Sequence, residues 1–85
     1  MFHYVYVLQS IHTKKLYIGY TNDLKKRFKQ HNNGESPATK PYIPYELICY
    51  EAFRDRKDAK AREEYLKSGW GLRSLKKMLE NFLKE

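Results

Sequence analysis

The first part of the chain alternates side chains in the way that β-strands do. In a strand over residues 2–8, one face would carry Phe2, Tyr4, Tyr6 and Leu8, and the other would carry His3, Val5 and Val7. Residues 15–20 read as a second strand. The segment between them, residues 9–14, is short and polar. An antiparallel hairpin is therefore the simplest connection between the two runs.

The length of the hairpin turn decides which residues of the two strands face each other. A two-residue turn at Ile11 and His12 predicts that Tyr6 lies directly opposite Tyr17, on the same face of the sheet. A turn of different length would shift this register.

The rest of the chain contains one further strand and three helical segments. Cap residues and apolar spacing predict a helix over about residues 22–33, and a loop with three prolines follows over residues 34–45. Residues 46–53 have the composition of a third strand, residues 56–68 are helical in pattern, and Gly69-Trp70-Gly71 should end that helix. The last helix carries an apolar stripe at Leu72, Leu75, Leu79, Phe82 and Leu83.

These elements define the expected fold. The order β-β-α-β-α-α predicts an α/β protein of the α+β type, with three helices on a small sheet. The 85 residues leave room for one domain, so we assign residues 1–85 to a single domain. The apolar stripe of the last helix should complete the core, because a sheet this small has little other cover.

One carboxylate stands out of place on the helix at residues 56–68. At about 100° per residue, Glu63 falls in the middle of the apolar stripe formed by Ala59, Leu66 and Trp70, whereas Glu64 points to solvent among lysines. Burying an unpaired carboxylate costs several kcal/mol, so Glu63 needs a cation or a metal beside it. A structural salt bridge is one explanation, and a functional site is the other.

Two donors share one edge of the helix at residues 22–33. Arg27 and His31 are four positions apart and flank the apolar stripe of Leu24 and Phe28. Beside a sheet that carries two tyrosines, they would point at one spot. Taken singly, an arginine that covers the edge of the core and a structural histidine are the ordinary explanations.

Together these residue types suit the hydrolysis of a phosphodiester. Such a reaction needs a base for the attacking water, a cation beside the phosphate and a metal held by a carboxylate. Glu63 can hold one Mg²⁺, Arg27 can bind a phosphate through two N–H groups, and His31 or a tyrosine can move a proton. The sequence has no glycine-rich phosphate loop, no Ser-His-Asp set and no histidines at zinc spacing.

Charge and composition narrow the class of protein. With 17 Lys and Arg against 10 Asp and Glu, the net charge of +7 suits a polyanion such as nucleic acid, and a solvated lysine-rich surface is the alternative. A hydrophobic content of 41% argues against disorder. No apolar run is long enough to span a membrane and the start lacks the order of a secretion signal, so we expect a cytoplasmic protein.

Two short motifs in a fixed order carry a resemblance to a known family. Tyr4-Val5-Tyr6 is followed, after ten residues, by Tyr17-Ile18-Gly19, and then by Arg27, His31 and Glu63 on helices. This series resembles the GIY-YIG nuclease superfamily. It is most similar to the small standalone members and to the nuclease domain at the start of the UvrC excision-repair subunit.

The resemblance implies both a fold and a chemistry. The fold is a three-stranded antiparallel sheet flanked by helices, and the activity is that of a divalent-metal endonuclease using Mg²⁺ or Mn²⁺. Glu63 would be the metal ligand, and Arg27 would stabilise charge on the scissile phosphate. Tyr6 and Tyr17 would position or activate the water with help from His31, and which tyrosine is the base stays open.

The sequence departs from the family pattern at two positions. Tyr4 stands in place of the first glycine of the motif, and Tyr20 stands where the excision-repair relatives carry a lysine. That lysine is a candidate for lowering the pKa of a tyrosine. Lys26, next to Arg27, is a possible substitute for that lysine but lies on the wrong side of the helix.

The leading hypothesis is a metal-dependent DNA endonuclease, structure-selective or nonspecific, acting in DNA repair or recombination. Because 85 residues leave no room for a separate DNA-binding domain, the protein would act on the shape of its substrate, need a protein partner for specificity, or be weak alone. A catalytically inactive nucleic-acid-binding module with the same fold is the alternative. A third hypothesis is a scaffold whose last helix docks a partner. The oligomeric state stays open.

Overall fold

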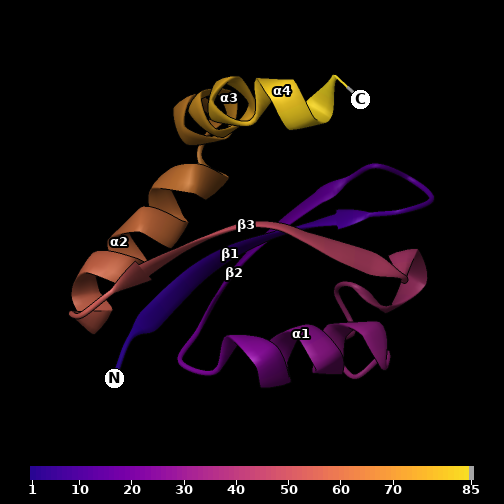
Figure 1. The fold of residues 1–85 in the computed structure, drawn as a ribbon, viewed down its shortest axis with the longest axis horizontal. Coiled ribbons are helices and arrows are strands. Elements are labelled where there is room, and N and C mark those ends of the chain that lie inside the picture. The colour runs from indigo at the N-terminus through magenta and orange to yellow at the C-terminus, as the bar shows by residue number, and fades with distance from the viewer. Residues whose placement is uncertain (85) are drawn as a thin grey trace.

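The sheet is the centre of the molecule in this computed structural model, which describes residues 1–84. Its antiparallel strands are β1 (His3–Ser10), β2 (Leu16–Thr21) and β3 (Tyr45–Phe53), arranged in the order β2-β1-β3 (Figure 1). The central strand β1 is buried from Val5 to Leu8, because helices cover both faces of the sheet. The prediction of a three-stranded antiparallel sheet is confirmed.

Helices lie on both sides of this sheet (Figure 1). The helix α1 (Leu24–Asn32) lies on one side, and α2 (Arg56–Lys67) and α3 (Gly69–Met78) lie on the other. A short 3₁₀ helix, η1 (Lys40–Tyr42), precedes β3, and α4 (Glu80–Leu83) follows α3. The predicted order β-β-α-β-α-α is confirmed, with the last predicted helix divided at Leu79 into α3 and α4.

The alternation of side chains along β1 separates two apolar clusters. On the α1 side, Tyr6 and Leu8 pack with Tyr45 and with residues of α1. On the other side, Val5 and Val7 pack with residues of α2 and α3. Each successive residue of β1 thus serves the opposite face, as a strand period of two requires.

The hairpin turn is longer than predicted, and the register prediction is wrong. Ser10 and Lys15 are joined by a backbone hydrogen bond, the turn runs from Ile11 to Lys14, and Lys14 has a φ of 65°. Tyr6 therefore lies opposite Gly19. Tyr17 lies opposite Leu8, so it is a diagonal neighbour of Tyr6 on the same face, because the shift is by two residues.

The junction after α2 also differs from the prediction. Ser68 ends α2 and caps α3, its Oγ accepting from the N–H of Gly71, so Gly69-Trp70-Gly71 forms the first turn of α3. A Cβ at Gly71 would overlap the carbonyl of Tyr65, which explains the glycine by close packing of the two helices. Trp70 is 74% exposed beneath Arg73, so its predicted place on the apolar stripe of α2 is wrong.

The apolar stripe of the last predicted helix completes the core, as expected. Leu75 is buried in the cluster on the α2 side, and Leu72 and Leu79 pack against that cluster. None of the helices within residues 1–84 has the length and apolar run needed to cross a bilayer.

Candidate functional site

A buried chain of hydrogen bonds links β1, α1 and the proline-rich loop. The hydroxyl of Tyr6 lies 2.8 Å from Nε2 of His31, and Nδ1 of the same ring lies 2.8 Å from Oγ1 of Thr39. Tyr6 is 1% exposed, and His31 and Thr39 are fully buried. Three polar side chains are thus held inside the apolar cluster on the α1 side, each with its partner in place.

We assign the directions of these hydrogen bonds from the Thr39 end of the chain. The Thr39 hydroxyl donates to the carbonyl of Ser36 at 3.4 Å, so its oxygen is left to accept from the Nδ1–H of His31. A neutral imidazole with its proton on Nδ1 has a free lone pair on Nε2. With this assignment of the tautomer, Nε2 accepts a hydrogen bond from the hydroxyl of Tyr6, so His31 is the base beside the phenol.

Burial shifts the pKa values of both rings toward their neutral forms. Desolvation raises the pKa of Tyr6 above its ordinary value, and the guanidinium of Arg27 acts in the opposite direction. Desolvation lowers the pKa of His31, and the charge of Arg27 lowers it further. The pair is therefore neutral at pH 7, with Arg27 as the charge nearest to it.

Gly19 lets the Tyr6 ring lie flat against the edge strand β2. A Cβ on Gly19 would lie 2.4 Å from both Cζ and Oη of Tyr6, a distance that real atoms do not adopt. Tyr17, two residues earlier on β2, is partly exposed, and its ring meets the ring of His31 edge-on at 5.0 Å. Tyr6, Tyr17 and His31 thus form one aromatic cluster that begins in the core and ends at the surface.

The start of α1 fixes the position of Arg27. The Asp23 side chain accepts the N–H of Lys26 and caps the helix, so Arg27 lies on the first turn and His31 one turn later. The guanidinium of Arg27 is partly buried and donates to Oε1 of Gln30. The structure brings Arg27, His31, Tyr6 and Tyr17 together on the α1 side.

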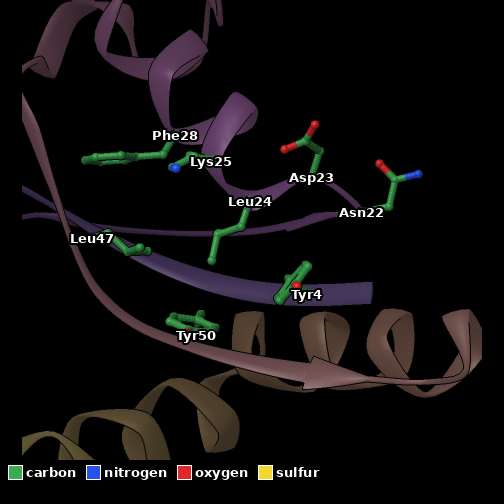
Figure 2. Close-up of a pocket in the computed structure, with 8 residues that line it drawn as sticks. All are labelled: Tyr4, Asn22, Asp23, Leu24, Lys25, Phe28, Leu47 and Tyr50. Carbon is green, nitrogen blue, oxygen red and sulfur yellow. The ribbon is translucent and has the colours of Figure 1, made fainter. Parts of the chain in front are cut away.

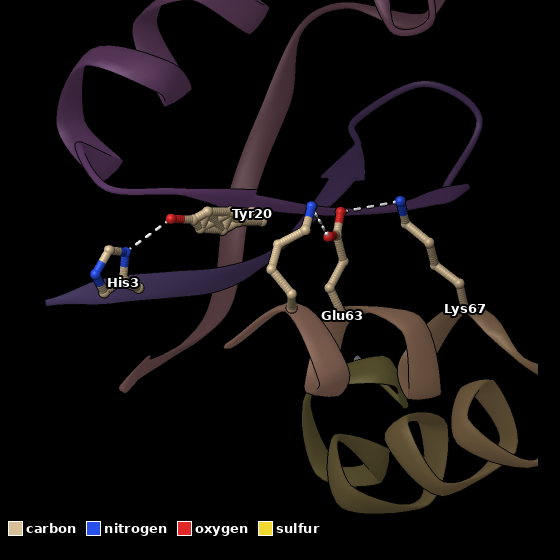
Figure 3. A network of polar contacts seen from close by, with 5 residues as sticks. His3, Tyr20, Glu63 and Lys67 are labelled. Atoms are coloured by element: carbon tan, nitrogen blue, oxygen red, sulfur yellow. Dashed lines mark hydrogen bonds and ion pairs between the residues drawn. The ribbon is translucent and has the colours of Figure 1, made fainter. Parts of the chain in front are cut away.

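Glu63 lies on α2, on the opposite side of the sheet. Its two carboxylate oxygens are held by Lys60 Nζ at 3.1 Å and by Lys67 Nζ at 3.0 Å (Figure 3). Burial acts to raise the pKa of Glu63, but the hydrogen bonds from Lys67 and Lys60 outweigh it and hold this pKa below its ordinary value. No hydrogen bond within residues 1–84 joins Glu63 to the aromatic cluster, although its charge reaches Tyr6 weakly.

The surroundings of Glu63 fit a divalent ion only in part. Residues 1–84 contain no group of three or more His, Cys, Asp or Glu side chains that could hold a metal. Mg²⁺ binds through one or two carboxylates and keeps several waters, so one glutamate is sufficient as its protein ligand. Such an ion would have to displace the ammonium group of Lys60 or Lys67.

Tyr20 points toward α2 and is covered by cations from that helix. Its ring lies 4.9 Å from Nζ of Lys60 and 5.7 Å from the guanidinium carbon of Arg56. Its hydroxyl is hydrogen-bonded to Nδ1 of His3 at 2.7 Å (Figure 3). The positive charge near position 20 therefore comes from α2. Lys26, by contrast, is exposed on α1.

A groove lies beside the N-terminal end of α1 (Figure 2). Its residues Leu24, Phe28 and Leu47 also pack against the cluster that contains Tyr6, so it is on the α1 side of the sheet. Its volume is about 410 Å³, and it is lined by Tyr4, Asn22, Asp23, Leu24, Lys25, Phe28, Leu47 and Tyr50. The ring of Tyr50 is 55% exposed and meets the ring of Tyr4 edge-on. A neighbouring hollow contains Lys26 and Arg27, so aromatic and basic surfaces adjoin at this end of the helix.

Three residues of this site were not predicted from the sequence. Thr39 lies in a loop without periodicity, so nothing in the sequence pairs it with His31. Lys60 and Lys67 stand three residues before and four residues after Glu63, a spacing that places side chains together on a helix. This spacing would have predicted both ion pairs with Glu63, but the lysines were interpreted as neighbours of the exposed Glu64.

Comparison with known proteins defines the class to which this arrangement belongs. The model of the GIY-YIG catalytic domain matches residues 2–72. A UPF0213 protein of Clostridium perfringens is 42% identical over 65 residues, which cover 75% of this chain and 69% of that protein. A UPF0213 protein of Haloquadratum walsbyi is 38% identical over 68 residues, covering 79% and 75%.

A solved structure agrees with these sequence matches. The solution NMR structure of a UPF0213 protein from Bacillus halodurans superimposes with a TM-score of 0.57 at 31% identity, covering 92% of this chain and 85% of that one. The chain therefore belongs to the GIY-YIG catalytic-domain family, in its UPF0213 branch. Nuclease domains of this family act on nucleic acids and generally depend on a metal ion.

Proposed function

We propose that this protein is a divalent-metal-dependent endonuclease that hydrolyses phosphodiester bonds in DNA. The observation that carries the proposal is the buried chain of Tyr6, His31 and Thr39 behind the partly exposed Tyr17. Apolar side chains would fill the same space without the cost of desolvating three polar groups. A histidine whose free lone pair faces a phenol is suited to proton transfer.

We assign contact with the attacking water to Tyr17 rather than to Tyr6. Tyr17 is partly exposed, whereas Tyr6 is shielded from solvent. Tyr6 and His31 pack behind it. The proton lost by the attacking water would pass to the Tyr17 oxygen as the Tyr17 hydroxyl proton passes to Tyr6, and the Tyr6 hydroxyl proton would pass to Nε2 of His31. The pair would thereby hold a proton close to the reacting groups.

Arg27 would bind the scissile phosphate. Its guanidinium is fixed by Gln30 and lies close enough to the aromatic cluster to act on the pKa of Tyr6 and His31. A fixed cation stabilises the charge that develops on a phosphate during hydrolysis. Lys25, Lys26 and Lys29 are exposed on the same helix and would attract the neighbouring phosphates.

Glu63 would hold the divalent ion, Mg²⁺ or Mn²⁺, after a lysine has moved from its carboxylate. A bound divalent ion polarises a phosphate and lowers the pKa of a coordinated water. The carboxylate lies on the α2 side of the sheet, where its partner Lys60 covers Tyr20 of the edge strand β2, whereas Tyr6 and Tyr17 face α1. The substrate phosphate would therefore lie at this edge of the sheet.

The groove beside α1 supports a structure-selective substrate. Bases stack on exposed aromatic rings, and basic side chains follow the phosphate backbone. Tyr50 offers such a ring and Lys25 such a charge. A base paired inside a duplex has no free face to offer, so a substrate with an unpaired base would gain most from this groove.

A nicking assay tests the proposal. Purified protein is incubated with supercoiled, branched and single-stranded DNA in Mg²⁺ or Mn²⁺ and in EDTA. Cleavage should require the metal and fall by about 100-fold or more in Glu63→Gln, because the lost ligand removes several kcal/mol of transition-state stabilisation.

The neighbouring carboxylate provides the matched control. Glu64 is exposed on the same helix, and Glu64→Gln makes the same chemical change. It should leave cleavage within about twofold of wild type. Equal losses in both variants, or cleavage that persists in EDTA, would reject the metal-dependent mechanism.

A catalytically inactive nucleic-acid-binding module is the second candidate. The observation that favours it is the pair of lysines that occupies both oxygens of Glu63. Binding to all three forms of DNA without cleavage by the folded wild type would select this candidate. A role in repair or recombination, a protein partner and a cytoplasmic location stay predictions from the sequence.

A further inference from the structure

Glu63 and its two lysines form a unit whose parts differ in exposure. The side chain of Glu63 is 13% exposed, whereas those of Lys60 and Lys67 are 48% and 52% exposed. The carboxylate is therefore fixed against the protein and the cations approach it from solvent. Ion pairs with exposed cations are weak and exchange readily.

The two lysines are held to different degrees. Lys60 lies over the ring of Tyr20 as well as beside Glu63, so two contacts restrain it. Lys67 has one ion-pair partner within residues 1–84, the carboxylate of Glu63. Lys67 is consequently the easier of the two to displace.

The charges of this unit oppose a second cation. One carboxylate and two ammonium groups leave a net charge of +1, and a divalent ion added to them would raise it to +3. Like charges at a few ångströms repel, whereas a phosphate brings negative charge to the same place. Binding of the phosphate would thus favour binding of the ion, and binding of the ion would favour binding of the phosphate.

We propose that Lys60 and Lys67 form an exchangeable clamp on Glu63 that makes divalent-ion binding and phosphate binding depend on each other. In the free protein the ammonium groups neutralise the carboxylate. When DNA is bound, they pass to phosphate oxygens and release Glu63 to the ion. This inference rests on the proposed function, since it assigns two positioning residues to that same site.

The first test measures binding of Mn²⁺ alone to the full chain by electron paramagnetic resonance. Lys60→Met and Lys67→Met each remove one competing charge while keeping most of the side-chain length. Each should bind Mn²⁺ about tenfold more tightly than wild type. Lys57→Met, an exposed lysine of α2 away from Glu63, should leave the affinity within about twofold.

The second test measures the coupling between ion and DNA. A short single-stranded oligodeoxynucleotide is added in the Tyr17→Phe background, which preserves every charge and should suppress cleavage. DNA should tighten Mn²⁺ binding about tenfold, and Mn²⁺ should tighten DNA binding by the same factor, because coupling is reciprocal. Removing both lysines should reduce this coupling to about twofold or less.

The outcomes separate this inference from the proposed function. Mn²⁺ binding that is lost in Glu63→Gln but unchanged in both lysine variants would overturn the clamp and leave the metal ligand in place. Coupling that persists without the lysines would overturn it as well. Mn²⁺ binding that is unaffected by Glu63→Gln would reject the assignment of Glu63 as the metal ligand, and the clamp would be rejected with it.

Discussion

The two faces of the sheet hold their polar side chains by different means. On the α1 side, Tyr6, His31 and Thr39 are at most 1% exposed and are joined by hydrogen bonds between neutral groups. On the α2 side, Glu63 is held by two lysines that are about half exposed. One set is inside the core, and the other borders solvent.

This difference separates fixed geometry from exchangeable charge. A buried network with every partner in place is rigid, because each broken hydrogen bond leaves a desolvated polar group. An exposed ion pair exchanges at little cost, because water and salt replace it. The α1 side is therefore suited to hold a proton in place, and the α2 side to admit an ion and a phosphate.

The largest expected effect comes from removing the hydroxyl of Tyr6. Tyr6→Phe should lower cleavage by about 100-fold or more, because the proton donor to His31 is lost. It should also lower the free energy of unfolding by about 1–3 kcal/mol, since Nε2 of His31 is left without a partner. Nicking assays and urea unfolding measure the two effects.

Tyr45→Phe is the control for this substitution. Tyr45 is also buried in the cluster on the α1 side, but its hydroxyl makes no hydrogen bond to another side chain within residues 1–84. We expect Tyr45→Phe to leave cleavage within about threefold of wild type. Similar losses in the two variants would show that Tyr6 acts through packing alone.

Gly19→Ala should act through the same ring from the neighbouring strand. The added Cβ would lie 2.4 Å from Oη of Tyr6, so the ring must leave the position from which its hydroxyl meets His31. We expect cleavage to fall by about tenfold or more and the free energy of unfolding by about 1–3 kcal/mol. Gly69→Ala, where no heavy atom lies within 4 Å, should be neutral or slightly stabilising. A Gly19→Ala variant as active as wild type would contradict the close contact.

The elements of the fold were predictable because their causes are local. Cap residues and apolar spacing give α1, and alternation gives the strands, without knowledge of distant contacts. The register of β1 against β2 was not predictable, because it depends on a turn in which Lys14 adopts a left-handed φ of 65°. Lysine carries no preference for that conformation, whereas a glycine there would have marked the longer turn.

The candidate site was predictable as a set of residues, and so was the approach of Arg27 and His31 to the two tyrosines, but the detailed geometry was not. The motif series and the spacing of Arg27 and His31 single out side chains on separate elements. That Tyr6 meets His31, while Glu63 lies across the sheet, depends on which face each strand residue serves and on how the loop delivers Thr39. These contacts join residues that are far apart in the sequence, so no local sequence pattern predicts them.

Thr39→Val tests the far end of the buried chain. Valine keeps the shape of the side chain but removes the oxygen that accepts from Nδ1–H of His31, which leaves a buried donor unpaired. The free energy of unfolding should fall by about 1–3 kcal/mol. Thr13→Val, in the exposed hairpin turn, should cost about 0.5 kcal/mol or less. Equal costs would contradict the assigned network.

The pH dependence of stability should reveal the neutral state of His31. Its pKa in the folded protein lies below the value of about 6.5 in the unfolded chain. Between these values the unfolded chain binds more protons, so stability should fall as the pH drops below about 6.5, by at most about 1.4 kcal/mol per pH unit. Urea unfolding of wild type and His31→Gln checks this, and an equal slope in both would assign the effect to other groups.

The smallest expected effect on stability comes from the lysine clamp. Lys67→Met should change the free energy of unfolding by about 0.5 kcal/mol or less, because an exposed i,i+4 ion pair contributes little and methionine retains the packing of the stem. Raising the ionic strength should reduce even that difference. A cost as large as that of Thr39→Val would make the clamp a structural element. An ammonium group so firmly bound would not give way to an ion, and the contrast between the two faces of the sheet would then fail.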